Sequence, residues 1–249
     1  MVTTKMCKLP SADWLFLFVV ELGWTLALIP PSPMGLSAWC YDSIFSFECQ
    51  TFFGRSLFFV GELGVNDYHF SFLTKSVQEI IQKIPDVIRT ISTAIERLIK
   101  HGATNFVVPR TIPSGCAPPV LALFPDAAPA EYNSTTGCLE DINKLGMHHN
   151  LLLQEALKKL RGRHPGGMIV YADLFGPIMD MVELPRKYGF EDVLTICCGG
   201  PGTLFCGDEG ANLCEKPAAC LFWDGVHLTE AAYHYIADVW LDSMDSPAI

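Results

Sequence analysis

Three short apolar runs alternate with two longer amphipathic stretches between residues 56 and 172, and this alternation constrains the fold more than any other feature. The runs are rich in branched and aromatic residues and have the length of buried strands: Ser56–Val60, Phe106–Val108 and Met168–Ala172. Residues 77–99 and 139–160 repeat apolar side chains at helical spacing. Strands that alternate with helices are typical of a parallel sheet covered by helices. The sequence therefore predicts an α/β protein with a parallel sheet.

The first predicted strand ends in the loop Gly61-Glu-Leu-Gly-Val-Asn-Asp67. In open α/β sheets, ligands bind beyond the carboxyl ends of the strands. A side-chain amide placed there can donate a hydrogen bond to a developing oxyanion. Asn66 is therefore a candidate oxyanion-hole residue, and Gly64 and Asp67 are candidates to line a substrate cleft. An ordinary turn is the competing interpretation, because Gly, Asn and Asp are common in turns.

A second polar motif precedes the last predicted helix. Asp224 and His227 lie three residues apart, and Thr229 can cap the helix that follows. A carboxylate beside an imidazole can fix its tautomer and stabilise the imidazolium, as a general base for a hydroxyl nucleophile requires. A helix cap next to a surface His is the plainer interpretation. The predicted apolar face of the helix consists of Tyr233, Ile236, Ala237, Trp240 and Leu241.

Four segments of the chain form a recognisable series. They are Ser56-Leu-Phe-Phe-Val-Gly-Glu-Leu-Gly-Val-Asn-Asp-Tyr68, Val107-Val-Pro109 with Pro113-Ser-Gly-Cys116, Cys197-Cys-Gly-Gly200, and Trp223-Asp-Gly-Val-His-Leu-Thr-Glu-Ala-Ala-Tyr233. In this order they resemble the plant GDSL esterase/lipase group, a branch of the SGNH hydrolases. The resemblance extends from about Cys40 to the end of the chain.

This resemblance implies a three-layer α/β/α fold of the SGNH-hydrolase type. It also implies hydrolysis of carboxylic esters by a Ser-His-Asp relay, with no metal and no organic cofactor. In that scheme His227 is the general base, Asp224 orients it, and Asn66 belongs to the oxyanion hole. The family's Gly-Asp-Ser block, which carries the nucleophilic Ser, is absent from this sequence, and the first strands of the family sheet are expected to be missing with it. Two functions are open: an ester hydrolase, and a catalytically inactive relative.

Composition limits the range of partners. The chain has 249 residues, 50% of them hydrophobic, and a net charge of -10 with Lys and Arg scattered along it. These values predict a globular domain with a large core and argue against a nucleic-acid-binding surface. We expect a monomer whose partner is a small-molecule or lipid ester.

The ten cysteines include no Cys-x-x-Cys pair and no zinc-type Cys/His spacing, which favours disulfides in an oxidising compartment over a metal site. Cys116 with Cys138 and Cys40 with Cys49 are candidate pairs, and at least one disulfide is expected within residues 197–220. The cysteines of that segment, whose connectivity the sequence leaves open, are Cys197, Cys198, Cys206, Cys214 and Cys220. Asn133-Ser-Thr is a candidate glycosylation site. We therefore expect a secreted protein.

The first 39 residues differ from the rest. Residues 14–29 form an apolar run interrupted by Glu21, too short and too costly to insert as a membrane span. A signal peptide ending near Ala38 is one interpretation. The preferred one is an apolar strand or helix left from a damaged amino-terminal half. The chain is accordingly divided into a divergent segment, 1–39, and a hydrolase domain, 40–249.

Three further polar residues are weaker candidates for a catalytic role. His148 and His149 fall inside the second predicted helix, whereas site His residues often lie on loops. Ser114 follows a predicted strand but lacks the flanking glycines of a nucleophile elbow. It is not assigned as a nucleophile, and a disulfide-tethered turn at residues 113–116 is an equally good interpretation.

Overall fold

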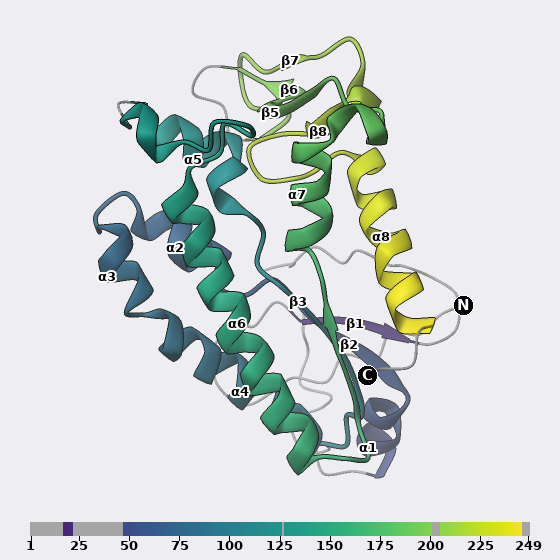
Figure 1. The fold of residues 1–249 in the computed structure, drawn as a ribbon. Coiled ribbons are helices and arrows are strands. Elements are labelled where there is room, and N and C mark those ends of the chain that lie inside the picture. The colour runs from purple at the N-terminus through teal and green to yellow at the C-terminus, as the bar shows by residue number, and fades with distance from the viewer. Residues whose placement is uncertain (1–16, 22–46, 126, 201–204, 246–249) are drawn as a thin grey trace. The chain divides into compact units, whose positions relative to one another are not determined.

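The computed structural model describes residues 17–21, 47–125, 127–200 and 205–245 (Figure 1). They form two compact units, each assembled from several stretches of the chain. The first unit draws on the described parts of 1–63, 86–109 and 154–171, and the second on those of 64–85, 110–153 and 172–249. Most of the predicted segment 1–39, including Ala38, lies outside the described residues, as does Cys40.

The first unit contains a four-stranded sheet. Its strands, in spatial order, are β1 (Leu17–Glu21), β2 (Ser56–Val60), β3 (Asn105–Pro109) and β4 (Met168–Ala172). β2 and β3 are parallel. The Met168 N–H donates to the Thr104 carbonyl and the Arg110 N–H to the Ala172 carbonyl, so β3 and β4 also run in one direction. The three predicted strands and the α/β class with parallel strands are confirmed.

Strand β1 is antiparallel to β2, with Leu17 opposite Val60 and Glu21 opposite Ser56. It covers the side of β2 that β3 leaves open. An uncovered strand edge presents free N–H and C=O groups to other chains, so β1 protects β2 from such pairing. The antiparallel pair was not predicted, although a strand was one of the two structures considered for the run 14–29.

The helices of this unit are α1 (Phe47–Gly54), α4 (Ile84–Lys100) and the last part of α6 (Glu140–Arg163). Pro85 is the second residue of α4, where a missing N–H costs nothing, and residues 82–83 separate α4 from the helix at Val77–Ile81. Gly102 lies just after the end of α4, where its φ is +97° and a Cβ would lie 3.0 Å from the Gln50 carbonyl oxygen.

Aromatic side chains fill the core of the first unit. The Phe58 ring stacks on Phe106 with centroids 5.6 Å apart and meets Phe53 edge-on at 5.4 Å. Buried aliphatic side chains from α4 and α6 complete it: Ile88, Ile91, Ile95, Leu98, Leu157 and Leu160.

The second unit combines helices with two short sheets. Its helices are α2 (Val65–Ser71), α3 (Val77–Ile81), α5 (Pro118–Leu123), the first part of α6, α7 (Phe175–Glu183) and α8 (Glu230–Asp245). β5 (Asp192–Ile196) is parallel to β8 (Cys220–Phe222), and β6 (Cys198–Gly199) is antiparallel to β7 (Asn212–Leu213). Helices α7 and α8 lie side by side (Figure 1). Their contact contributes to a core that includes Ile178, Met181, Leu221, Ala232 and Ile236.

The buried face of α8 is shifted from the predicted one. Ala232 and Ile236 are buried, whereas Tyr233 is 46% exposed and Leu241 is 61% exposed. Trp240 is half-buried and its indole N–H donates to the Asp173 carbonyl. The helical spacing was predicted correctly, but the orientation of the buried face was not. The two alanines at 231 and 232 have too little apolar area to mark that face in the sequence.

None of the helices in the described ranges is long and apolar enough to cross a lipid bilayer.

Candidate active site

The candidate site is built on the loop between β8 and α8. The Trp223 N–H donates to the His227 carbonyl at 2.9 Å, which closes a tight turn around Asp224. Thr229 fixes the far end of the loop: its hydroxyl donates to the Cys220 carbonyl at 2.7 Å and accepts from the Ala232 N–H at 3.4 Å. The predicted cap of the last helix is therefore present, and it fixes the loop against both β8 and α8.

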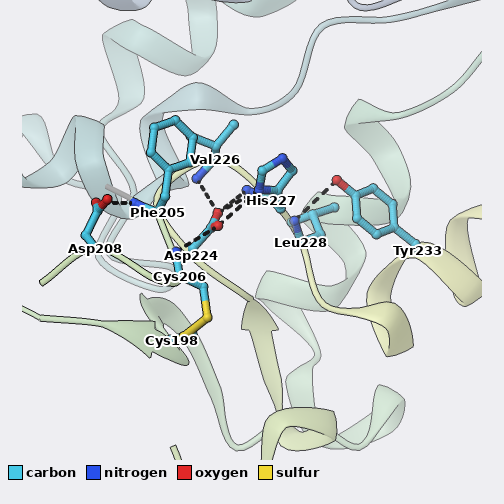
Figure 2. A network of polar contacts seen from close by, with 9 residues as sticks. All are labelled: Cys198, Phe205, Cys206, Asp208, Asp224, Val226, His227, Leu228 and Tyr233. Atoms are coloured by element: carbon cyan, nitrogen blue, oxygen red, sulfur yellow. Dashed lines mark hydrogen bonds and ion pairs between the residues drawn. A yellow bond between two sulfur atoms is a disulfide. The ribbon is translucent and has the colours of Figure 1, made fainter. Parts of the chain in front are cut away.

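The Asp224 carboxylate is the centre of the hydrogen-bond network in Figure 2. Its Oδ1 accepts from the backbone N–H groups of Val226 at 2.9 Å and His227 at 2.8 Å, and its Oδ2 accepts from the Cys206 N–H at 3.3 Å. Asp224 is only 3% exposed. Desolvation alone would raise the pKa of this carboxyl, but the backbone donors and His227 outweigh it, and the pKa lies below its ordinary value. Asp224 is thus ionised at neutral pH.

His227 completes the pair. Its Nδ1 lies 2.9 Å from Oδ1 and 3.1 Å from Oδ2 of Asp224 (Figure 2). Because an ionised carboxylate can only accept, Nδ1 carries the proton and the lone pair is on Nε2. The side chain of His227 is 54% exposed. The imidazole can therefore accept a proton from an incoming hydroxyl or water.

Disulfides hold the segments that contact this hydrogen-bond network. Cys206, whose N–H reaches Asp224, is bonded to Cys198, and the Cys198 N–H donates to the Trp223 carbonyl at 2.6 Å. A second disulfide joins Cys197 to Cys214. The expectation of at least one disulfide within residues 197–220 is confirmed, and two are present.

Asn66 stands apart from this pair in its hydrogen bonding. It is exposed, and it is the second residue of α2, whose N-cap Gly64 has a φ of 106°. The sequence had placed it in a loop or turn, and the structure corrects this to the first turn of a helix. No hydrogen bond joins Asn66 to Asp224 or His227 among the residues described, and Asp67 is likewise exposed. Convergence of Asn66 with the Asp-His pair remains a prediction.

Helix α2 is anchored through two consecutive side chains that sequence reasoning did not connect. The Tyr68 hydroxyl lies 2.7 Å from Nδ1 of His149, and Nε2 of His69 lies 2.8 Å from Oγ of Ser114. Burial lowers the pKa of each imidazole to about 4, and burial followed by the charge of Asp67 raises the pKa of Tyr68. Both imidazoles are neutral at pH 7, so His149 acts as an anchor of α2 in this structure.

Ser114 is a tether in this structure. It is 5% exposed, and it opens the 3-10 turn Ser114–Cys116. The neighbouring N–H groups are occupied: Gly115 donates to Oδ1 of Asn143 and Cys116 to the Pro113 carbonyl. The predicted Cys116–Cys138 disulfide is present and confirms the disulfide-tethered turn. With no free backbone donor beside it, Ser114 lacks the surroundings of an acyl-transfer nucleophile.

Asn133 is half-buried in a turn. Its Oδ1 accepts from the N–H groups of Thr135 and Thr136, each at 3.0 Å, and its Nδ2 donates to Glu140 at 3.3 Å. Glycosylation at this residue stays a prediction.

Comparison with known proteins identifies the family of this chain. A model of the GDSL-like lipases and acylhydrolases matches residues 54–240, which include Asn66, Asp224 and His227. The chain belongs to this family. It is 40% identical over 210 residues to a GDSL esterase/lipase of Arabidopsis thaliana, with 81% of this chain and 54% of the relative covered. It is 38% identical over 198 residues to the sinapine esterase of Brassica napus, with 76% of this chain and 52% of the relative covered.

The GDSL-like chain spans about half the length of the curated relatives it matches. The region matched by the family model contains the Cys116–Cys138 and Cys197–Cys214 disulfides and the whole Asp224–His227 loop. Membership in this hydrolase family supports ester hydrolysis as the family chemistry.

Proposed function

We propose that His227 is the general base of a carboxylic-ester hydrolase site and that Asp224 is the carboxylate that orients it. The observation that carries the proposal is the geometry of the pair: a buried, ionised carboxylate holds Nδ1 of an exposed imidazole at 2.9 Å. Family membership supports the reaction class, and the geometry of the pair supports these roles. Small-molecule or lipid esters are the substrates.

In this mechanism Nε2 of His227 takes the proton of the attacking hydroxyl, and Asp224 stabilises the imidazolium that forms. The imidazolium then gives that proton to the leaving alkoxide. The side-chain amide of Asn66, with backbone N–H groups, donates to the oxyanion of the tetrahedral intermediate, and Gly64 and Asp67 line the substrate cleft. No cofactor takes part in these steps.

A catalytically inactive relative is the second candidate, and one observation favours it. The sequence contains no Gly-Asp-Ser segment, and Ser114, the Ser that follows a predicted strand, is buried and hydrogen-bonded to His69. Loss of the nucleophile from a Ser-His-Asp site lowers kcat by about 10⁶-fold. On this alternative the protein keeps the Asp-His loop and does not turn over esters.

An ester assay separates the two candidates. Hydrolysis of p-nitrophenyl butyrate is measured for the unmodified chain, His227→Ala and His234→Ala, the last an exposed His on α8 that serves as the matched control. Turnover lost in His227→Ala and kept in His234→Ala supports the hydrolase. Equal rates in the unmodified chain and in His227→Ala contradict it. A fluorophosphonate probe followed by peptide mapping then identifies any reactive Ser.

Secretion and glycosylation belong to the same proposal. Three disulfides among the described cysteines support folding in an oxidising compartment. Expression in a secretory host, followed by digestion with an N-glycosidase, tests Asn133: a mobility shift that disappears in Asn133→Gln is the expected result. Size-exclusion chromatography tests the expected monomer.

A further inference from the structure

A third cysteine lies against the Cys197–Cys214 disulfide. Cys220 is a free thiol, and its Sγ is 3.6 Å from Sγ of Cys214. The sulfur atoms of all three residues lie within 4.8 Å of one another. Thiolate attack on a disulfide sulfur needs this kind of approach.

We propose that Cys197, Cys214 and Cys220 form an intramolecular thiol–disulfide exchange site. The Cys220 thiolate attacks Sγ of Cys214, the Cys214–Cys220 bond forms, and the bond to Cys197 breaks. The electron pair of the broken bond leaves on Cys197, which takes up a proton to become the free thiol. No oxidant or reductant is consumed, because one disulfide and one thiol are present before and after the step.

The exchange moves the thiol between two different environments. Cys220, at the start of β8, is half-buried, whereas Cys197, just after β5, is 2% exposed. The exchanged form therefore carries its thiol where external reagents do not reach it. The site also lies one residue from Cys198, whose disulfide holds Cys206 against Asp224. Exchange thus changes the covalent support next to Asp224, the carboxylate that orients His227.

The charges around Cys220 set the conditions for the test. Burial, followed by the carboxylates of Asp192 and Glu191, raises the pKa of the Cys220 thiol. Glu191 is itself paired with Lys216 at 3.0 Å. Because only the thiolate attacks, exchange is expected to accelerate as the pH is raised.

Cleavage after glutamate distinguishes the two pairings. Digestion after Glu191, Glu209, Glu215 and Glu230 places Cys197 in residues 192–209, Cys214 in 210–215 and Cys220 in 216–230. The full chain is incubated at about pH 8.5 without reductant and then acidified to stop the exchange. It is unfolded in denaturant so that the buried Cys197 thiol becomes accessible, trapped with N-ethylmaleimide, and digested. The original pairing links 192–209 to 210–215 and leaves Cys220 alkylated. The exchanged pairing links 210–215 to 216–230 and leaves Cys197 alkylated.

We expect both linked pairs in the unmodified chain, and the second pair to be absent from Cys220→Ser. In Cys197→Ser, Cys214 should pair with Cys220 completely. The proposal is overturned if 210–215 is linked to 192–209 alone after long incubation, or if Cys214 and Cys220 both remain free in Cys197→Ser under air. A link between 192–209 and 216–230 would overturn the assignment of Cys214 as the attacked sulfur.

Discussion

Oδ1 of Asp224 accepts a hydrogen bond from Nδ1 of His227 at 2.9 Å and another from the N–H of the same residue at 2.8 Å. The carboxylate therefore binds both the backbone N–H and the ring of His227. This double contact fixes the orientation of the imidazole before any substrate binds, which is the condition for a preorganised base.

Asp224→Asn is expected to reverse the tautomer of His227. The carboxamide can donate to Nδ1, so the proton moves to Nε2 and the lone pair that would accept a proton is lost. Two-dimensional ¹⁵N NMR of the ring at neutral pH reads this directly, with His227→Ala to assign the signals. If the proton is already on Nε2 in the unmodified chain, the assigned role of Asp224 is wrong.

Acid is expected to destabilise the second unit over a defined range. The folded protein keeps His149 neutral down to about pH 4, whereas the unfolded chain takes up a proton near 6.5, so protonation favours unfolding. Full stability is present above about pH 6.5, and about 3 kcal/mol is lost per such His by pH 4. His69 adds a second loss in the same window.

Urea denaturation at a series of pH values measures this loss. His149→Gln should reduce the slope between pH 6.5 and 4, because one of the two titrating groups is gone. His148→Gln, at the exposed neighbour, should reduce the slope by less, because the charge of His148 is the smaller of the two causes that lower the pKa of His149. Equal slopes for the two variants would argue against a neutral buried His149.

The Tyr68–His149 contact is expected to be a strong individual anchor. Tyr68→Phe leaves a buried ring nitrogen without its partner, which costs about 1 to 3 kcal/mol of unfolding free energy. A double-mutant cycle with His149→Gln should give a coupling above about 0.5 kcal/mol. Tyr188→Phe, whose hydroxyl accepts from Tyr235 and from Nζ of Lys187 near the surface, is the control and should cost less.

Gly115 should not tolerate a side chain. A Cβ there would lie 2.1 Å from the Leu139 carbonyl oxygen, which is backbone and cannot rotate away. Gly115→Ala is expected to cost more than about 2 kcal/mol and to displace the turn that carries Ser114. Gly162→Ala, with no atom within 4 Å of the added Cβ, should be neutral or stabilising. Thermal unfolding of the two variants compares them directly.

The parallel strands and long helices could be predicted because their signals are local. Val60, Val108 and Ala172 end apolar runs whose length alone separates strand from helix, and all three strands occur where expected. The Asp224–His227 contact could also be anticipated, since three residues in a tight loop bring both side chains together.

Other features depend on contacts that a single sequence does not encode locally. The pairing of Cys197 with Cys214, and not with Cys220, depends on how β5 and β8 align. The His69–Ser114 bond joins residues 45 positions apart, and neither has a pattern around it that predicts a partner. Asn66 lies in the first turn of a helix whose N-cap, Gly64, has a positive φ, which Gly permits but does not require.

The pairing of β1 with β2 bears on how the chain is processed. A peptidase that cut near Ala38 would break the covalent link between β1 and β2. Once β1 dissociated, the five residues of β2 would have no hydrogen-bond partners along that edge. The processed and the unprocessed chain would then differ in their tendency to add strands from other molecules. In this fold, cleavage between β1 and β2 is therefore expected to promote self-association as well, because the same strand pair covers the edge of β2.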